Sequence, residues 1–239
     1  MHFENSQTLN EYVSGMCNGE AMLAFSTGKD SIVAWLEMKK YFRRITPIYL
    51  YSVPDLEFVE RELRYYEDFF KTRIVRLPHP SVYRQLNNLV FQAPENCTII
   101  ENAGLPDFDY DDIYSIVRQE LALTHDLYAA SGVRARDSLN RWAAIKKYGP
   151  LNETKQTFFP IFDFTKADMV KALRESKVRL PVDYRMFGRS FDGIDYRFLA
   201  PIKEHYPRDY ERILAFFPLA DLELKRIEYR REYYANSGE

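Results

Sequence analysis

Residues 26–31 bring small residues, a lysine and a carboxylate together in one short stretch: Ser26, Thr27, Gly28, Lys29, Asp30 and Ser31. Small residues let successive backbone N–H groups point to one side, and a following helix would add its partial positive charge to that of Lys29. This combination is the chemistry of a phosphate cradle. It is not a Walker A loop, which needs a glycine where this chain has Leu23.

A second stretch, residues 132–141, supplies arginines after a glycine. Gly132 lets the chain turn, so that Arg134 could reach a phosphate or sulfate, with Arg141 two helical turns further on. Arginine suits this task because its planar fork binds oxyanions through two hydrogen bonds. Asp137 has two open roles, orienting an arginine or binding a metal.

The first stretch resembles the S-G-G-K-D-S loop of the PP-loop superfamily, the adenine-nucleotide α-hydrolases, which includes N-type ATP pyrophosphatases and phosphoadenosine phosphosulfate (PAPS) reductases. Thr27 stands at the first glycine of that loop, a tolerable change if the position keeps a negative φ. Residues 132–141 resemble the G-x-R-x-x-E-S-x-x-R segment of PAPS reductases, with Asp137 for Glu. Residues 159–165 are similar, more weakly, to a later P-L-x-x-W-T segment, and the resemblance spans residues 20–205.

The resemblance implies an adenine nucleotide, ATP or PAPS, with Mg²⁺, held at the C-terminal edge of a parallel sheet. Its implied catalytic residues are Lys29, Arg134 and Asp30, and Asp30 is the candidate magnesium ligand. The implied nucleotide-binding residues are those of 26–31 with Tyr51, Ser52, Gly132, Arg134 and Arg141, and at Tyr51 core packing is an equal alternative.

The chain also departs from PAPS reductases. It has no cysteine after Cys97, so it lacks both their C-terminal catalytic cysteine and the cysteines of the iron–sulfur forms. With only Cys17 and Cys97 and no C-x-x-C, the sequence predicts neither an iron–sulfur cluster nor zinc.

Three functions therefore stay open. The first is an ATP pyrophosphatase that adenylylates an acceptor, either a nucleic acid or a small molecule. The second is a PAPS reductase-like enzyme that uses an external thiol. The third is a non-catalytic nucleotide-binding module of a larger nucleic-acid-modifying assembly, which would involve a protein partner or a homo-oligomer.

The elements that must position these residues alternate along the chain. Apolar runs at 20–25, 45–51, 74–77 and 126–130 predict strands, and amphipathic spacing predicts helices at 31–42, 55–70, 113–123, 134–147 and 165–175. Thr165 and Asp168 form a predicted capping box. This order predicts an α/β fold: an open, mostly parallel, Rossmann-like sheet with helices on both faces. We expect one nucleotide-binding domain over 1–205, with an acidic loop or insertion at 94–112, and a helical extension over 206–239.

Composition limits the remaining choices. The 239 residues are 46% hydrophobic and carry a net charge of −2, which excludes a disordered or disulfide-rich chain. No run approaches the length of a membrane helix and the start is polar, so a cytoplasmic protein without a membrane partner is expected. The charge is uneven: 95–126 is acidic, and 134–155 holds six bases against two acids.

Overall fold

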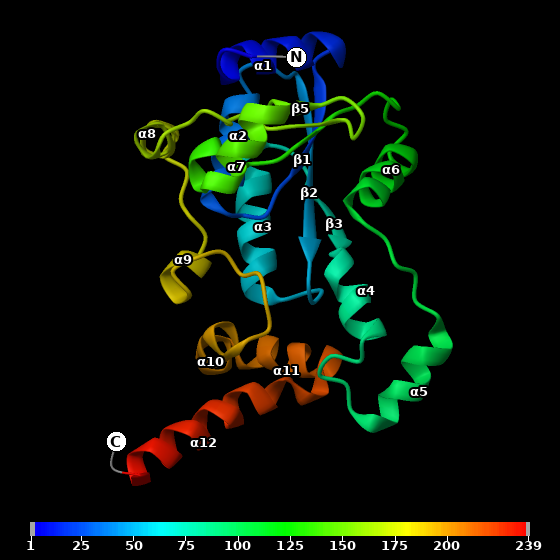
Figure 1. The fold of residues 1–239 in the computed structure, drawn as a ribbon, viewed down its shortest axis with the longest axis vertical. Coiled ribbons are helices and arrows are strands. Elements are labelled where there is room, and N and C mark those ends of the chain that lie inside the picture. Colours follow the sequence, from blue (N-terminus) through cyan, green and yellow to red (C-terminus); the bar gives the residue numbers. More distant parts are fainter. Residues whose placement is uncertain (1–2, 238–239) are drawn as a thin grey trace. The chain divides into compact units, whose positions relative to one another are not determined.

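The computed structural model describes residues 3–237, and its central feature is a six-stranded sheet (Figure 1). The strands are β1 (Glu20–Ala24), β2 (Arg44–Tyr51), β3 (Val75–Pro78), β4 (Ala129–Ala130), β5 (Leu151–Asn152) and β6 (Thr157–Phe158), in the order β3-β2-β1-β4-β6-β5. β1 pairs in parallel with β2 and β4, β4 pairs in parallel with β6, and β5 runs antiparallel to β6. The predicted α/β class with an open, mostly parallel sheet is confirmed.

The helices carry the connections between strands. They are α1 (Ser6–Met16), α2 (Lys29–Met38), α3 (Glu57–Phe70), α4 (Pro80–Asn87), α5 (Pro94–Ala103), α6 (Tyr110–Glu120), α7 (Leu139–Tyr148), α8 (Lys166–Ser176), α9 (Asp183–Met186), α10 (Tyr196–His205), α11 (Pro207–Phe216) and α12 (Leu222–Ser237), with 3₁₀ turns η1 (Ala135–Asp137) and η2 (Pro218–Asp221). The predicted capping box of Thr165 and Asp168 opens α8. In the described part of the chain, no helix combines the length and the apolar character needed to cross a membrane.

The strand order reverses at β1. The chain moves from β1 to β2 to β3 in one direction, and β4 then pairs on the other side of β1. Because parallel crossovers are right-handed, such a reversal puts the earlier and later connecting helices on opposite faces. Figure 1 shows α2 and α3 on one side of the strands and α6 on the other. The ends of β1 and β4 therefore form a topological switch point, where open α/β sheets bind ligands.

The chain divides into two compact units. The first contains residues 1–50, 63–77 and 109–181, and the second contains 51–62, 78–108 and 182–239. Residue 205, the predicted domain boundary, lies inside the second unit at the end of α10. The predicted helical C-terminal extension, 206–239, is present over its described residues as α11, η2 and α12.

Local chemistry explains where the elements differ from expectation. Part of the predicted acidic loop or insertion, 94–112, forms helix α5, because Pro94 begins the helix and Gly104 ends it in the left-handed conformation at φ 55°. The predicted strand at 126–130 is reduced to Ala129–Ala130, because Arg118 donates two hydrogen bonds to the Leu127 carbonyl and holds that segment in a turn. The helix predicted from 134 starts at 139 instead.

The core of the first unit is aromatic where α2 and α3 cover the sheet. Trp35 lies parallel to Phe70, with ring centroids 3.9 Å apart, and it meets Phe25 edge to face, with centroids 4.9 Å apart. Phe25 in turn contacts Tyr66. Trp35 is 1% exposed, so the whole indole contributes to the buried apolar surface. This packing fixes the start of α2 against the end of β1, which is where the cradle residues lie.

We expect Trp35→Ala to lower the free energy of unfolding by about 3–5 kcal/mol, because it leaves a large cavity between α2 and α3. The matched control is Trp142→Ala, since that indole is half exposed on α7. The control should stay within about 0.5 kcal/mol of the wild type. Urea denaturation of both variants measures the difference, and equal losses would contradict this account of the core.

The second unit contains a buried carboxyl, Asp183, which is 4% exposed and accepts a hydrogen bond from the Phe191 amide. Burial, with a smaller contribution from the neighbouring Glu62 carboxylate, raises the pKa of Asp183 to about 6. In the unfolded chain the same group loses its proton near pH 4. Protonated Asp183 therefore favours folding below about pH 4, and this contribution is lost as the pH rises through about 6.

Asp183→Asn should remove this dependence, because the amide stays neutral. We expect the wild type to lose about 3 kcal/mol of stability relative to this variant between about pH 4 and pH 7.5. Urea titrations across that range measure it. Glu211→Gln, at an exposed carboxylate on α11, should keep the wild-type pH profile, and parallel profiles for wild type and Asp183→Asn would contradict the assignment.

Candidate functional site

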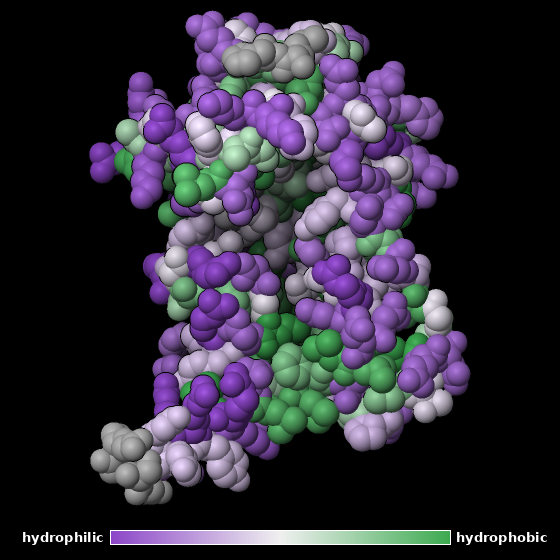
Figure 2. Space-filling view, in the orientation of Figure 1, coloured by the Kyte–Doolittle hydropathy of each residue, from purple (hydrophilic) through white to green (hydrophobic). Residues whose placement is uncertain are grey.

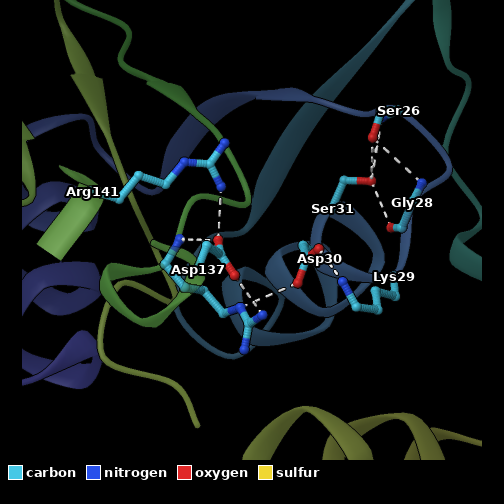
Figure 3. Close-up of polar contacts among 8 residues, drawn as sticks. Ser26, Gly28, Lys29, Asp30, Ser31, Asp137 and Arg141 are labelled. Carbon is cyan, nitrogen blue, oxygen red and sulfur yellow. Dashed lines mark hydrogen bonds and ion pairs between the residues drawn. The ribbon is translucent and has the colours of Figure 1, made fainter. Parts of the chain in front are cut away.

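The cradle loop, residues 26–31, lies between the end of β1 and the start of α2 (Figure 3). The Ser31 hydroxyl donates to the Gly28 carbonyl at 2.9 Å and accepts from the Ser26 amide at 3.3 Å. The Ser26 hydroxyl accepts from the Gly28 amide at 3.4 Å. Gly28 is the N-cap of α2 and offers no side-chain cap, so the first-turn amides of this helix are not covered by a capping side chain. The loop is therefore closed by its own hydroxyls, and the first turn of α2 has the uncapped amides that suit an anion.

The backbone at Thr27 corrects one expectation. A negative φ was the condition for tolerating threonine there, but Thr27 has φ 57°, in the left-handed region that disfavours a β-branched residue. Two observations compensate: the side chain is 4% exposed, and its hydroxyl donates to the Ser26 carbonyl at 2.6 Å. The loop thus keeps the backbone conformation that suits glycine, although Thr27 is strained in it.

Gly132 brings the second predicted motif against the first. A Cβ atom at this position would lie 2.7 Å from the Asp30 carbonyl carbon and 2.8 Å from the Ser31 amide nitrogen. No real side chain fits there, because these are backbone atoms at the first turn of α2. Residues 132–141, the arginine segment, therefore leave β4 in direct contact with the cradle loop.

Ion pairs join the two segments. Arg134, whose side chain is 7% exposed, places Nε 3.2 Å from Asp30 Oδ1 and Nη2 2.6 Å from Asp137 Oδ1. Asp137 also accepts from Arg141 Nη1 at 2.9 Å, and Lys29 Nζ lies 2.6 Å from Asp30 Oδ2. Figure 3 shows Asp137 turned toward Arg141 and Asp30 turned toward Lys29. The five side chains form one continuous chain of alternating charge.

This chain defines what the predicted site residues can do. Lys29 is 44% exposed, so its ammonium can meet a ligand, whereas the Arg134 guanidinium is buried between two carboxylates. Asp30 pairs with both Lys29 and Arg134, and its binding of Mg²⁺ stays a prediction. Among residues 3–237, no group of three or more His, Cys, Asp or Glu side chains is placed to hold a metal ion.

Tyr51 and Ser52 lie at the end of β2 and belong to the second unit, so their contact with adenine stays a prediction. Burial raises the pKa of the Tyr51 hydroxyl above its ordinary value. Asp137 takes the first of the two roles that the sequence left open, because it orients Arg134 and Arg141. Its spacing of three from Arg134 and four from Arg141 suits these ion pairs.

No protein-family model and no curated protein sequence matches this chain. Similar solved structures include an NH3-dependent NAD synthetase from Campylobacter jejuni, at 10% identity and a TM-score of 0.46 over 92% of each chain. A PAPS reductase from Candida auris is 12% identical with a TM-score of 0.45, over 79% of this chain and 91% of that one. A predicted tRNA methyltransferase subunit from Methanocaldococcus jannaschii is 17% identical with a TM-score of 0.35, over 80% and 92%.

Gly132→Ala should destabilise the first unit by about 1–3 kcal/mol, because the added methyl must displace the backbone at the start of α2. Thr27→Gly is the matched control in the same site. Relief of its left-handed strain should offset the lost hydroxyl bond and the added chain entropy, leaving stability within about 1 kcal/mol of the wild type. Urea denaturation measures both, and an unaffected Gly132→Ala would refute the close approach.

Proposed function

We propose that this protein is a PP-loop enzyme that binds ATP and cleaves it between the α- and β-phosphates, transferring the adenylyl group to an acceptor. The observation that carries the proposal is the junction of the cradle loop and the arginine segment at the switch point of the sheet. Open α/β sheets bind ligands at this place, and two oxyanion-binding motifs meet there.

In the proposed reaction, the amides at the start of α2 and the Lys29 ammonium hold the β- and γ-phosphates. An acceptor oxygen attacks the α-phosphorus, the bond from that phosphorus to the bridging oxygen breaks, and pyrophosphate leaves. The acceptor loses its proton to solvent and gains the adenylyl group. Lys29 and the helix dipole stabilise the charge that builds on the leaving pyrophosphate.

Arg134 and Asp30 act in this proposal chiefly by position. Their ion pair fixes the arginine segment against the first turn of α2, so the cradle is held before the nucleotide binds. Arg141 is 51% exposed at its side chain, and its guanidinium can reach solvent beyond Asp137. A phosphate group can therefore approach Arg141 with less rearrangement than it needs at the buried Arg134.

The cysteines favour ATP cleavage over thiol-based sulfate reduction. Cys17 is 7% exposed, and burial raises the pKa of its thiol, which makes it a poor nucleophile at neutral pH. Its thiol donates to the Asp126 carbonyl at 3.5 Å. Cys97 lies in the second unit on α5 and donates to the Ala93 carbonyl. A PAPS reductase-like reaction would therefore need an external thiol.

Product analysis tests the proposal. The protein is incubated with α-labelled ATP and Mg²⁺, and separately with PAPS and a thiol. Labelled AMP or an adenylylated species, together with pyrophosphate, is the expected result. Sulfite release from PAPS would contradict this proposal and support a PAPS reductase-like enzyme. Nucleotide binding without turnover in either incubation would support a non-catalytic nucleotide-binding module.

Lys29→Ala should weaken ATP binding by about 1.5–3 kcal/mol, the worth of one charge-assisted contact. Lys171→Ala is the matched control, because Lys171 is an exposed lysine of the same unit on α8, with 72% of its side chain accessible. Isothermal titration calorimetry of the two variants separates the local contact from a general loss of positive charge. Equal affinities for the two variants would remove Lys29 from the cradle.

A further inference from the structure

Helix α7 is almost entirely exposed. Of its 10 residues only Ile145 is buried. Besides the buried Ile145, it carries three exposed apolar side chains: Leu139 is 84% exposed, Trp142 50% and Tyr148 69%. By helical spacing Leu139 and Trp142 lie toward one edge of the exposed surface and Tyr148 toward the other, so apolar groups at both edges are available to a partner.

The same helix is purely basic. It carries Arg141, Lys146 and Lys147 and no acid. Arg141 pairs with Asp137, but within residues 3–237 neither Lys146 nor Lys147 forms an ion pair; each ammonium lies over an aromatic ring instead. Lys146 Nζ is 4.8 Å from the Trp142 ring centroid, and Lys147 Nζ is 4.8 Å from that of Tyr148. Two positive charges are thus left for a partner to neutralise.

These aromatic–lysine pairs match the two halves of a nucleotide. A base has a flat π-face that stacks on Trp or Tyr whatever its sequence, and the backbone phosphate attached to it needs a cation nearby. Each pair on α7 offers a ring and an ammonium within a few Å of one another. An acidic peptide would use the lysines but has no flat faces for the rings, so the surface favours unstacked bases, which only a single strand exposes.

A groove continues this surface. It has a volume of about 610 Å³, within the range of small-molecule sites. Its lining includes Ile145 and Tyr148 of α7, Leu151 of β5, and Lys155. All of these residues belong to the first unit. In Figure 2, apolar side chains coloured green reach the surface among polar ones in the area that α7 occupies in Figure 1.

Helix α12 looks similar in composition but differs in charge. It exposes Tyr229 and Tyr233 beside Arg230 and Arg231. However, it also carries three glutamates, and Arg226 is paired with Glu223 at 2.8 Å. Its positive charge is largely neutralised within the helix, so the electrostatic attraction to phosphates is weaker there than on α7.

We propose that the exposed face of α7 and the adjoining groove bind a single-stranded polynucleotide. The arginine segment connects this surface to the cradle loop through Asp137, Arg134 and Asp30, so a bound strand lies in the same unit as the nucleotide site. The polynucleotide is then the acceptor class of the adenylyl transfer, and this second statement rests on the proposed function, whereas the binding itself does not.

Fluorescence anisotropy with labelled U20 and dT20 oligonucleotides tests the binding on the full chain. Trp142→Ala should weaken binding about 10-fold by removing a stacking platform. Lys146→Gln with Lys147→Gln should lower the slope of log K against log salt by about 1.4, the value for two released single-strand counterions. Comparison of the two oligonucleotides says whether RNA or DNA is the source.

The matched control changes the other basic–aromatic helix, with Tyr229→Ala and Arg230→Gln combined, and should bind as the wild type does. Loss of binding in this control with none in the α7 variants would overturn the proposal. So would absence of oligonucleotide binding in the wild type, or a shift to a smaller mass for Trp142→Ala in sedimentation, which would assign the surface to a second copy of this chain.

The two proposals fail separately. Calorimetric ATP binding without oligonucleotide binding contradicts only the inference about α7. Oligonucleotide binding without ATP binding contradicts the proposed function and the acceptor assignment, but leaves the polynucleotide surface itself supported.

Discussion

The close approach of Gly132 to the first turn of α2 is the constraint on which the rest of the site depends. It allows the loops after two neighbouring parallel strands to touch through backbone atoms, at the point where the strand order reverses. Only then can Arg134 lie between Asp30 on one loop and Asp137 on the other. A longer separation would leave a buried guanidinium with one partner, at a cost of several kcal/mol. Gly132 therefore permits the arginine segment to contact the first turn of α2, and the ion pairs of Arg134 stabilise that contact.

The charges of this arrangement also decide what it can bind. Lys29, Arg134 and Arg141 carry three positive charges, and Asp30 and Asp137 carry two negative ones, so the connected group keeps an excess of one positive charge. Burial of Arg134 holds the group rigid, while Lys29 and Arg141 keep about half of their side-chain surface in solvent. In a site of this kind the positive side chains are already positioned before an anion binds, so binding requires little reorganisation. The buried Arg134 therefore positions the group, and the exposed Lys29 and Arg141 are the side chains that can contact an anion.

The sequence predicted the parts of this site that depend on local chemistry. The order of strands and helices, the turn after β1 and the capping box at Thr165 follow from periodicity and residue type, and the structure contains all three. The missed features depend on distant residues. The strand at β4 is shortened by Arg118, which comes from α6, and the left-handed backbone of Thr27 is maintained by packing that no local preference indicates. The ion pair between Asp30 and Arg134 forms only when β4 pairs with β1, whereas the orienting role of Asp137 follows from its own spacing to Arg134 and Arg141.

Helix stability alone accounts for the basic residues of α7 but not for its exposed apolar residues. Lysines in the last turn of a helix interact favourably with its dipole, and Lys146 and Lys147 lie there, ahead of Gly149. A short helix is marginally stable by itself, and the Ser138 N-cap and the Arg141–Asp137 ion pair stabilise α7. Neither effect requires Leu139 and Trp142 to face water. Their exposed surface is available for contact with another molecule, and the lysines over the rings favour a polyanion with flat faces as that partner.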